Sequence, residues 1–180
     1  AAVSCDPTSI SITEINLAAN GLDGTLPVSM GVFGNLSIMK LQQNQLWGTL
    51  PAQVCQLSTL QYADFYNNSI SGTIPAAIGD LSSLQTLYFG HNSMTGTIPE
   101  AIGSLSTLLQ LGLQFNEFVG SVPALGNLGS LTILHLGNNT LRGTFPESVC
   151  KLHGLVLLDL TCNELSGPIP DCFGDLVALS

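Results

Sequence analysis

Basic residues are scarce in this sequence of 180 residues. Three lysines and arginines stand against twelve aspartates and glutamates, which gives a formal net charge of −9 at neutral pH. A chain this acidic repels the phosphates of nucleic acids and anionic membrane surfaces, so we exclude both as direct partners. The charge would suit a basic partner, and it would equally serve to keep an apolar molecule soluble.

Long apolar runs are also absent, although 45% of the residues are hydrophobic and the mean hydropathy is +0.41. No run of eighteen apolar residues occurs, so the sequence predicts no membrane-spanning helix within this chain. The first residues show no signal peptide, as expected of a mature or trimmed chain. The apolar residues are instead spread along the chain, in a quantity that predicts a large core.

The sequence offers little for metal binding or catalysis. Its five cysteines form no C-x-x-C pair and have no histidine neighbour at the spacing of metal ligands. No serine or cysteine sits beside a plausible base with a third, orienting group. Glu14, Asp64 and Asp159 are too dispersed to act as the paired carboxylates of a glycosidase. We therefore expect no metal, no cofactor and no enzymatic activity.

A unit of 24 residues recurs along the whole chain. In the copy LQTLYFGHNSMTGTIPEAIGSL the fixed points include Leu87, Phe89, Asn92 and Pro99. One interval is a residue short, in the coil that contains SVPALGNL. Self-similarity at such a period is the signature of a solenoid. The repeated asparagine falls at Asn20, Asn44, Asn68, Asn92, Asn116, Asn139 and Asn163, and the proline at Pro27, Pro51, Pro75, Pro99, Pro123, Pro146 and Pro170.

The pattern within one unit explains why the unit must be repeated. Paired apolar positions such as Leu111 and Leu113 point one way from a short strand, while the residues between them point the other way. One such strand buries nothing alone, so the coils must stack to share a core. The asparagine side chains can hydrogen-bond the backbone of their own and adjacent turns. We therefore interpret the asparagine ladder as structural.

The frame L-x-x-L-x-L-x-x-N-x-L-x-G-x-I-P-x-x-[IVLF]-G-x-L resembles plant-type leucine-rich repeats. These occur in receptor kinase ectodomains, receptor-like proteins and polygalacturonase inhibitors. The resemblance covers residues 10–180 and implies an α/β solenoid, a curved right-handed superhelix with a parallel concave sheet, a short second sheet and a 3-10 or irregular convex side. Residues 1–180 would form one domain of about seven complete repeats and a truncated eighth. We expect a fragment of a longer chain, because neither end carries a complete cap.

The resemblance also gives an expectation for each cysteine. The motif from Cys150 to Cys172 resembles a bridged segment of plant receptor-like proteins, which implies a disulfide between these two residues. Cys55 and Cys162 are expected to be unpaired small hydrophobic residues. Cys5 stands where such repeats carry the second cysteine of an N-terminal cap, but its upstream partner is absent. Either the sequence is cut short of a preceding cap that carries the partner cysteine, or Cys5 is free.

Three sequons, at Asn35, Asn67 and Asn138, point to a secretory route and to possible glycans. Asn35 is expected on the convex side, and the other two at the rim of the concave sheet. An extracellular or cell-surface location, and a secreted glycoprotein, are the corresponding expectations. Glycans at the rim would restrict the part of the concave surface that a partner could reach.

In leucine-rich repeat proteins, function is usually carried by strand residues that face out of the concave sheet. Aromatic side chains gather there on three successive middle strands, flanked by polar and charged residues, which is typical of binding surfaces. The alternative is that these side chains merely cover a sheet that has few charges. We expect a peptide, glycan or protein to dock on this face. The candidate binding residues are Lys40, Asp64, Tyr66, Tyr88, His91, Gln114, Phe115, His135 and Asp159.

Three alternative functions remain open. The chain could be a structural or scaffold subunit of a larger assembly that makes contacts through its convex side or ends. It could instead be an enzyme inhibitor of the polygalacturonase-inhibitor type. A remote alternative is an ice-binding solenoid, because a hydroxyl column precedes the prolines, although Trp47 and Arg142 interrupt the neighbouring column. The hydroxyl column consists of Thr25, Thr49, Thr73, Thr97, Ser121 and Thr144.

Overall fold

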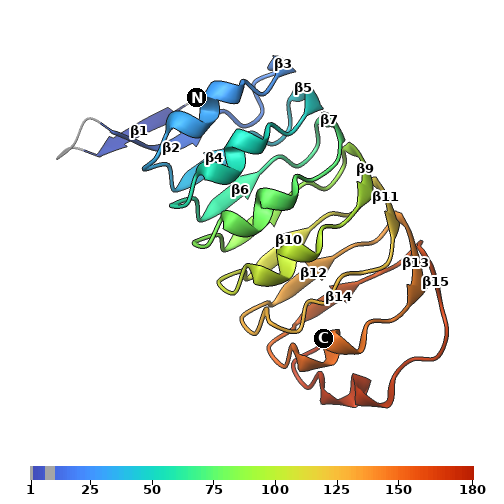
Figure 1. Cartoon of the computed structure of the whole chain (residues 1–180). Helices are drawn as coiled ribbons and strands as arrows, with labels where there is room; N and C mark the ends of the chain where they lie inside the picture. The colour runs from blue at the N-terminus through green and yellow to red at the C-terminus, as the bar shows by residue number, and fades with distance from the viewer. Residues whose placement is uncertain (1, 7–10) are drawn as a thin grey trace.

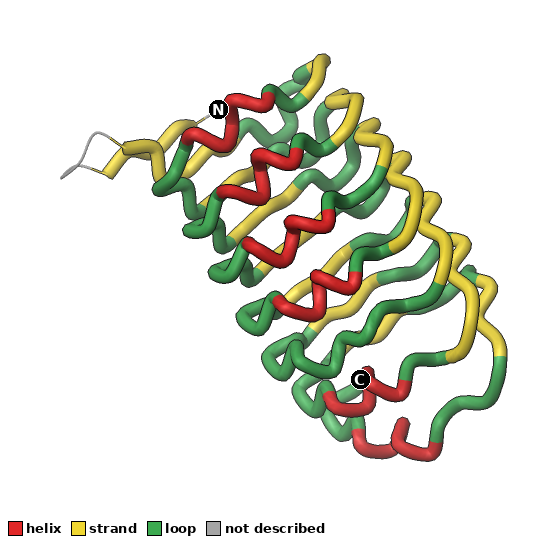
Figure 2. The backbone as a smooth tube through the Cα atoms, viewed as in Figure 1, coloured by secondary structure: helices red, strands yellow, loops and turns green. Residues whose placement is uncertain are grey.

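The computed structural model describes residues 2–6 and 11–180 and shows a curved solenoid of stacked coils (Figure 1). Each coil contributes a short strand to one sheet, turns at the ladder asparagine, adds a strand to a second sheet and returns along the convex side. Figure 2 shows the helical turns in a row on one side of the stack. Within the described residues, no helix is long and apolar enough to cross a membrane.

The concave sheet has eight strands, and all but the first run parallel. Its register aligns equivalent residues of successive repeats, so that Ala63 pairs with Leu87 and Leu87 with Leu111. Side chains at one repeat position therefore form columns across the sheet. The strands are β1 (Ala2–Asp6), β2 (Ser11–Asn16), β4 (Ile38–Lys40), β6 (Tyr62–Asp64), β8 (Thr86–Tyr88), β10 (Gln110–Gly112), β12 (Ile133–His135) and β14 (Leu157–Asp159).

The second sheet is parallel and has seven strands. Its strands end near a glycine with positive φ, such as Gly72 at 75° and Gly96 at 77°. A residue with a side chain adopts this conformation at a steric disadvantage, which explains the repeated glycine. The strands are β3 (Asp23–Thr25), β5 (Gln45–Thr49), β7 (Ser69–Gly72), β9 (Ser93–Thr97), β11 (Glu117–Gly120), β13 (Thr140–Thr144) and β15 (Glu164–Ser166).

Short 3-10 helices follow the repeat prolines on the convex side. Pro51 and Pro75 have φ values of −65° and −60° at these positions, close to the value that the proline ring imposes. Between β11 and β12, where the repeat is one residue short, the chain crosses without such a helix. The helices are η1 (Val28–Val32), η2 (Ala52–Gln56), η3 (Ala76–Asp80), η4 (Glu100–Ser104), η5 (Glu147–Lys151) and η6 (Asp171–Asp175).

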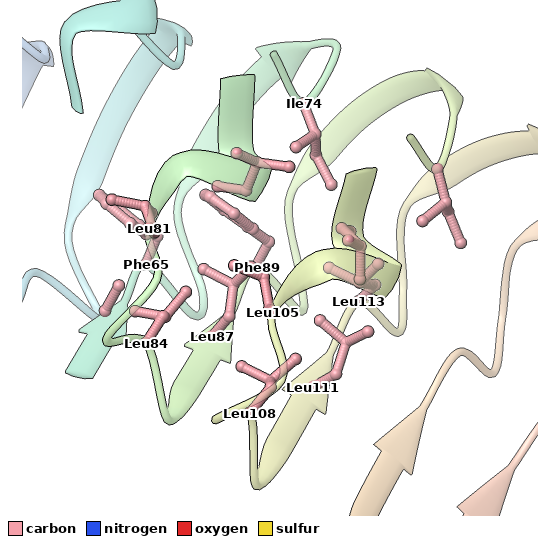
Figure 3. Close-up of a cluster of buried hydrophobic side chains, with 14 of the residues drawn as sticks. Phe65, Ile74, Leu81, Leu84, Leu87, Phe89, Leu105, Leu108, Leu111 and Leu113 are labelled. Atoms are coloured by element: carbon pink, nitrogen blue, oxygen red, sulfur yellow. The ribbon is translucent and has the colours of Figure 1, made fainter. Parts of the chain in front are cut away.

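The apolar repeat positions meet in one continuous core between the two sheets and the convex side (Figure 3). Leu87 and Leu111 from the concave strands are almost completely buried. Phe65 and Phe89 stack with ring centroids 4.9 Å apart and planes 7° apart. Burying one such side chain contributes about 1.5 to 3 kcal/mol, and stacking the coils multiplies that contribution.

The ladder asparagines bind the backbone of neighbouring coils. The Asn92 side-chain nitrogen donates to the carbonyls of Phe65 at 3.0 Å and Phe89 at 2.9 Å. Its oxygen accepts the N–H of Ile70 at 2.9 Å. Asn68 and Asn116 repeat this arrangement one coil away on either side. These bonds satisfy backbone groups at the inner turn that would otherwise be buried without partners.

The first strand is a feature that the repeat does not predict. Strand β1 pairs antiparallel with β2 and adds an edge strand beside the first coil. Its sequence departs from the repeat frame, so the periodic pattern carries no signal for it. The side chain of Cys5 lies outside the described residues, and both interpretations of that cysteine stay open.

The other cysteines differ in their surroundings. A disulfide joins Cys150 in η5 to Cys172 in η6, with the Cα atoms 5.7 Å apart. Cys55 is buried and unpaired, and burial together with the charge of Asp80 raises the pKa of its thiol to about 11. Cys162 is unpaired but exposed, with φ at 51°. The expectation that Cys55 and Cys162 are unpaired is confirmed, but the exposed side chain of Cys162 does not pack as a small hydrophobic residue.

Candidate recognition surface on the concave sheet

Aromatic rings from successive coils touch one another on the concave side. We call Tyr62, Tyr66, Tyr88, His91 and Phe115 the concave aromatic cluster. The rings of Tyr62 and Tyr88 meet edge to face with centroids 6.5 Å apart. His91 lies between Tyr66, at 5.0 Å, and Phe115, on which it stacks at 4.1 Å. The cluster therefore consists of two groups of touching rings, one formed by Tyr62 and Tyr88 and the other by Tyr66, His91 and Phe115.

Two members of this cluster occupy the repeat position whose backbone is left-handed in each coil. His91 and Phe115 directly precede ladder asparagines and have φ values of 54° and 55°. Residues other than glycine adopt this left-handed region at a disadvantage of about 1 to 3 kcal/mol. The turn directs the ring of Phe115 toward solvent, where it is 45% exposed. A large apolar side chain in a strained turn gains little for folding, which makes it a candidate contact residue.

A hollow of about 280 Å³ lies beside the cluster. Glycines in the surrounding columns allow its walls to lie close to the sheet. A Cβ atom at Gly112 would lie 2.6 Å from Cδ1 of Tyr88, and one at Gly90 would lie 2.8 Å from Cδ of Gln114. The hollow is lined by Asp64, Tyr66, Tyr88, Gln114, Ile133 and His135.

Asp64 is the buried carboxylate of this hollow, with 6% of its surface exposed. Burial raises the pKa of the Asp64 carboxyl above its ordinary value, against the opposing effects of two hydrogen bonds and the charge of Lys40. The bonds come from the Tyr66 N–H at 2.9 Å and the Tyr62 hydroxyl at 3.3 Å. Burial and the Asp64 charge in turn raise the pKa of Tyr62 to about 12.

The remaining charged candidates form pairs at either end of the hollow. Lys40 lies 3.4 Å from Glu14, and its ammonium is 5.6 Å from the ring centroid of Tyr62. At the other end, Nδ1 of His135 is 3.7 Å from Asp159. Burial raises the pKa of Asp159, but hydrogen bonds from Thr161 and the nearby His135 outweigh it, so the pKa is lowered.

The hollow unites five of the nine candidate residues, namely Asp64, Tyr66, Tyr88, Gln114 and His135. The other four, Lys40, His91, Phe115 and Asp159, do not line it. Sequence reasoning did not select Ile133, which lines the hollow although its column is largely apolar. It also left out the hydroxyl of Tyr62, whose bond to Asp64 could be anticipated because the two residues share one face of β6.

The three sequons lie where their repeat positions predict. Asn35 is exposed in the convex turn that follows η1. Asn67 and Asn138 precede ladder asparagines with φ at 54°, at the rim of the concave sheet. Asn67 is exposed and adjoins Tyr66, so a glycan there would border the concave aromatic cluster.

The hydroxyl column of the second sheet is exposed, but its methyl groups have a packing role. A Cβ atom at Gly48 would lie 2.9 Å from Cγ2 of Thr25, and one at Gly96 would lie 2.7 Å from Cγ2 of Thr73. Trp47 projects beside this column with 53% exposure and donates to Asp23. The surface is therefore uneven, and threonine at these positions has a structural explanation.

Among residues 2–6 and 11–180, no group of three or more histidine, cysteine, aspartate or glutamate side chains could hold a metal ion. The polar groups of the hollow are the Asp64 carboxylate, the Gln114 amide, the His135 imidazole and two tyrosine hydroxyls. This arrangement can recognise a ligand by charge, ring contact and hydrogen bonding.

A family model described as a leucine-rich repeat region matches residues 17–165. The chain belongs to the leucine-rich repeat family. No curated protein matches this leucine-rich repeat chain. The stacked coils and asparagine ladder described above are the structural basis of the match.

Solved structures similar to this leucine-rich repeat chain include ectodomains of plant receptor kinases. The ectodomain of the receptor kinase GASSHO1/SCHENGEN3 from Arabidopsis thaliana, in complex with CASPARIAN STRIP INTEGRITY FACTOR 2, is 36% identical with a TM-score of 0.90, and the match covers 92% of this chain and 20% of that chain. The plant peptide hormone receptor RGFR1, in complex with RGF2, is 36% identical with a TM-score of 0.88, covering 93% and 27%. The chain thus spans about a fifth to a quarter of the length of these two proteins.

Two further structures extend the comparison. The ectodomain of the Arabidopsis receptor kinase HAESA, in complex with an IDA peptide hormone ligand, is 31% identical with a TM-score of 0.88, covering 98% of this chain and 34% of that chain. A plant ice-binding protein is 23% identical with a TM-score of 0.68, covering 86% and 57%. This last likeness shows a shared fold alone.

Proposed function

We propose that this chain is a non-catalytic, extracellular recognition module that binds an extended peptide or protein segment along its concave sheet. The observation that carries the proposal is the concave aromatic cluster beside a hollow that contains a buried carboxylate. Aromatic side chains give large contact area with little loss of conformational freedom, which suits a binding surface. The columns of the sheet offer a ligand equivalent positions on successive coils.

The similar structures support a peptide ligand. RGFR1 is a peptide hormone receptor solved with RGF2, and HAESA was solved with a peptide hormone. Their ectodomains resemble this chain over most of its length. The Cys150–Cys172 disulfide and the three sequons suit the extracellular location proposed here. An inhibitor that docks an enzyme on the concave face would use the same surface.

A second candidate is a structural subunit that makes contacts through the coil ends. Ile169 and Val177 are 73% and 84% exposed, and these aliphatic side chains offer apolar surface for such a contact. Under this alternative, substitutions on the concave sheet would leave partner binding unchanged.

The test is a selection from a random peptide library with the wild-type chain, followed by affinity measurements on variants. Combining Tyr66→Ala with Phe115→Asn removes two rings from the cluster, and asparagine suits the positive φ of position 115. Each ring should contribute about 1 to 2 kcal/mol, so the double variant should bind at least about tenfold more weakly. Trp47→Ala is the matched control, because it removes an exposed ring from the second sheet.

Loss of binding in the concave variant, with Trp47→Ala unaffected and both proteins folded, supports the proposal. Equal binding by the concave variant and the wild type would overturn it and favour contacts through the convex side or the ends.

A further inference from the structure

The hollow beside the concave aromatic cluster is rich in hydrogen-bond acceptors. The Asp64 carboxylate receives one bond from the Tyr66 N–H and one from the Tyr62 hydroxyl. A carboxylate can accept about four hydrogen bonds, so about half of its capacity remains. The side-chain oxygen of Gln114 is shut off from solvent and has no hydrogen-bond partner among the described residues. Gln114 lines the hollow, so this amide is an unsatisfied polar group beside it.

No cation of this chain neutralises Asp64 by direct contact among the described residues. Lys40 is paired with Glu14, and Arg142 with Glu164 on the second sheet. Lys151 belongs to η5 on the convex side. Neither lysine nor arginine lines the hollow, and its one basic group, His135, lies beside Asp159. The hollow therefore combines a buried carboxylate with no lysine or arginine that pairs with it.

The aromatic side chains that line the hollow suit a cation, as the Asp64 carboxylate does. The rings of Tyr66 and Tyr88 line it. A ligand cation within about 6 Å of an aromatic ring centre is attracted by the ring by about 0.5 to 2 kcal/mol. The volume of about 280 Å³ is suited to one long side chain and lies below the range of about 300 to 1,000 Å³ typical of small-molecule sites.

We infer that this hollow binds the ammonium or guanidinium group of one lysine or arginine of a docked peptide, an inference that rests on the proposed function. The cation would approach Asp64 between the rings of Tyr66 and Tyr88, and donate hydrogen bonds to Asp64 and Gln114. An anionic side chain is disfavoured there by the carboxylate. The overall charge of −9 likewise favours the approach of a basic segment over an acidic one.

Burial of Asp64 gives this inference an energetic basis. The free chain keeps a carboxylate that is poorly solvated, and burial raises the pKa of that group. A ligand cation would stabilise the ionised form directly. Functional positions commonly retain a locally unfavourable group that a ligand compensates.

The test uses the same random peptide library and compares the wild-type chain with Asp64→Asn and Asp171→Asn. Asparagine keeps the shape of Asp64 and an acceptor for the Tyr66 N–H, but removes the charge. Asp171→Asn is the matched control, because it removes the same charge from an exposed position in η6. Circular dichroism and urea unfolding establish that each protein is folded.

We expect wild type and Asp171→Asn to select peptides enriched in lysine or arginine at one position, and Asp64→Asn to lose that enrichment. A selected peptide resynthesised with citrulline for arginine, or acetyl-lysine for lysine, should bind wild type about tenfold more weakly. This second measurement decides the question even if Asp64→Asn does not fold.

Selected peptides with no basic preference, or a preference that survives Asp64→Asn, would overturn the inference. The proposed function would survive that result if binding still depends on Tyr66 and Phe115. Failure of the wild-type chain to bind any peptide through its concave sheet would overturn the proposed function and this inference together.

Discussion

The hydroxyl of Tyr62 donates a hydrogen bond to the carboxylate of Asp64 at 3.3 Å, from the same face of strand β6. The two groups influence each other, because burial and the Asp64 charge raise the Tyr62 pKa while the Tyr62 bond opposes the rise in the Asp64 pKa. Asp64 is thus held by its own strand in a place where its charge is poorly solvated. This pair links the regular repeat to the candidate site.

Asp64→Asn should leave the free energy of unfolding at pH 7 unchanged or raise it by up to about 1 kcal/mol. The pKa of Asp64 is raised in the folded chain, so the ionised form is penalised by folding. That penalty is complete above the raised pKa and disappears as the pH falls below the ordinary aspartate value. Urea unfolding at pH 7 and near the acid limit of folding measures the difference. A clear loss of stability at pH 7 would contradict this account of Asp64.

Gly112→Ala should destabilise the chain by about 1 to 3 kcal/mol, because the added methyl group would lie 2.6 Å from the Tyr88 ring. The same change should alter the hollow, since Tyr88 lines it. Gly129→Ala is the control, because a Cβ atom there meets nothing within 4 Å. Thermal unfolding of both variants checks the prediction. Equal melting temperatures would mean that Tyr88 does not depend on the glycine beneath it.

Asn92→Ala should destabilise the chain by at least about 2 kcal/mol. The Ile70 N–H loses its acceptor, and the carbonyls of Phe65 and Phe89 each keep one ladder asparagine as donor and lose the other. Asn35→Ala, in an exposed convex turn, should change stability by less than about 0.5 kcal/mol. Denaturant unfolding of the two proteins, made without glycans, gives both values. Similar values for the two variants would remove the structural interpretation of the ladder.

Cys55 and Cys162 should react very differently with iodoacetamide. Cys162 is exposed, whereas Cys55 is buried and the pKa of its thiol is raised to about 11. Since the thiolate is the reactive form, the folded chain should be modified at Cys162 and protected at Cys55 near pH 8. Peptide mass mapping before and after unfolding identifies the labelled positions. Rapid labelling of Cys55 in the folded chain would contradict its burial.

The repeat made most of the fold predictable. The period predicted a solenoid of stacked coils, and the resemblance of the repeat frame to plant-type leucine-rich repeats implied both sheets and the convex side. Strand β1 lay outside that pattern, since its sequence carries no repeat. The exposure of Cys162 follows from its repeat position directly before a ladder asparagine, where φ is positive in each coil.

The candidate site was only partly predictable. Column positions identified Asp64, Tyr66 and Tyr88 as neighbours on the concave sheet. The burial of Asp64 and the inclusion of Ile133 depend on how side chains lean across glycines of the next coil. Such sideways packing is set by three coils at once, and one repeat unit does not reveal it.

The most direct test of the concave hollow as a binding site is a titration of the isoleucine methyl groups, observed by NMR, with a peptide selected by the wild-type chain. Ile133 lines the hollow, and Ile169 is 73% exposed in the last coil. We predict that the Ile133 signal shifts in proportion to binding while the Ile169 signal stays in place. A shift of Ile169 with an unchanged Ile133 signal would place the ligand at the coil ends and contradict the account.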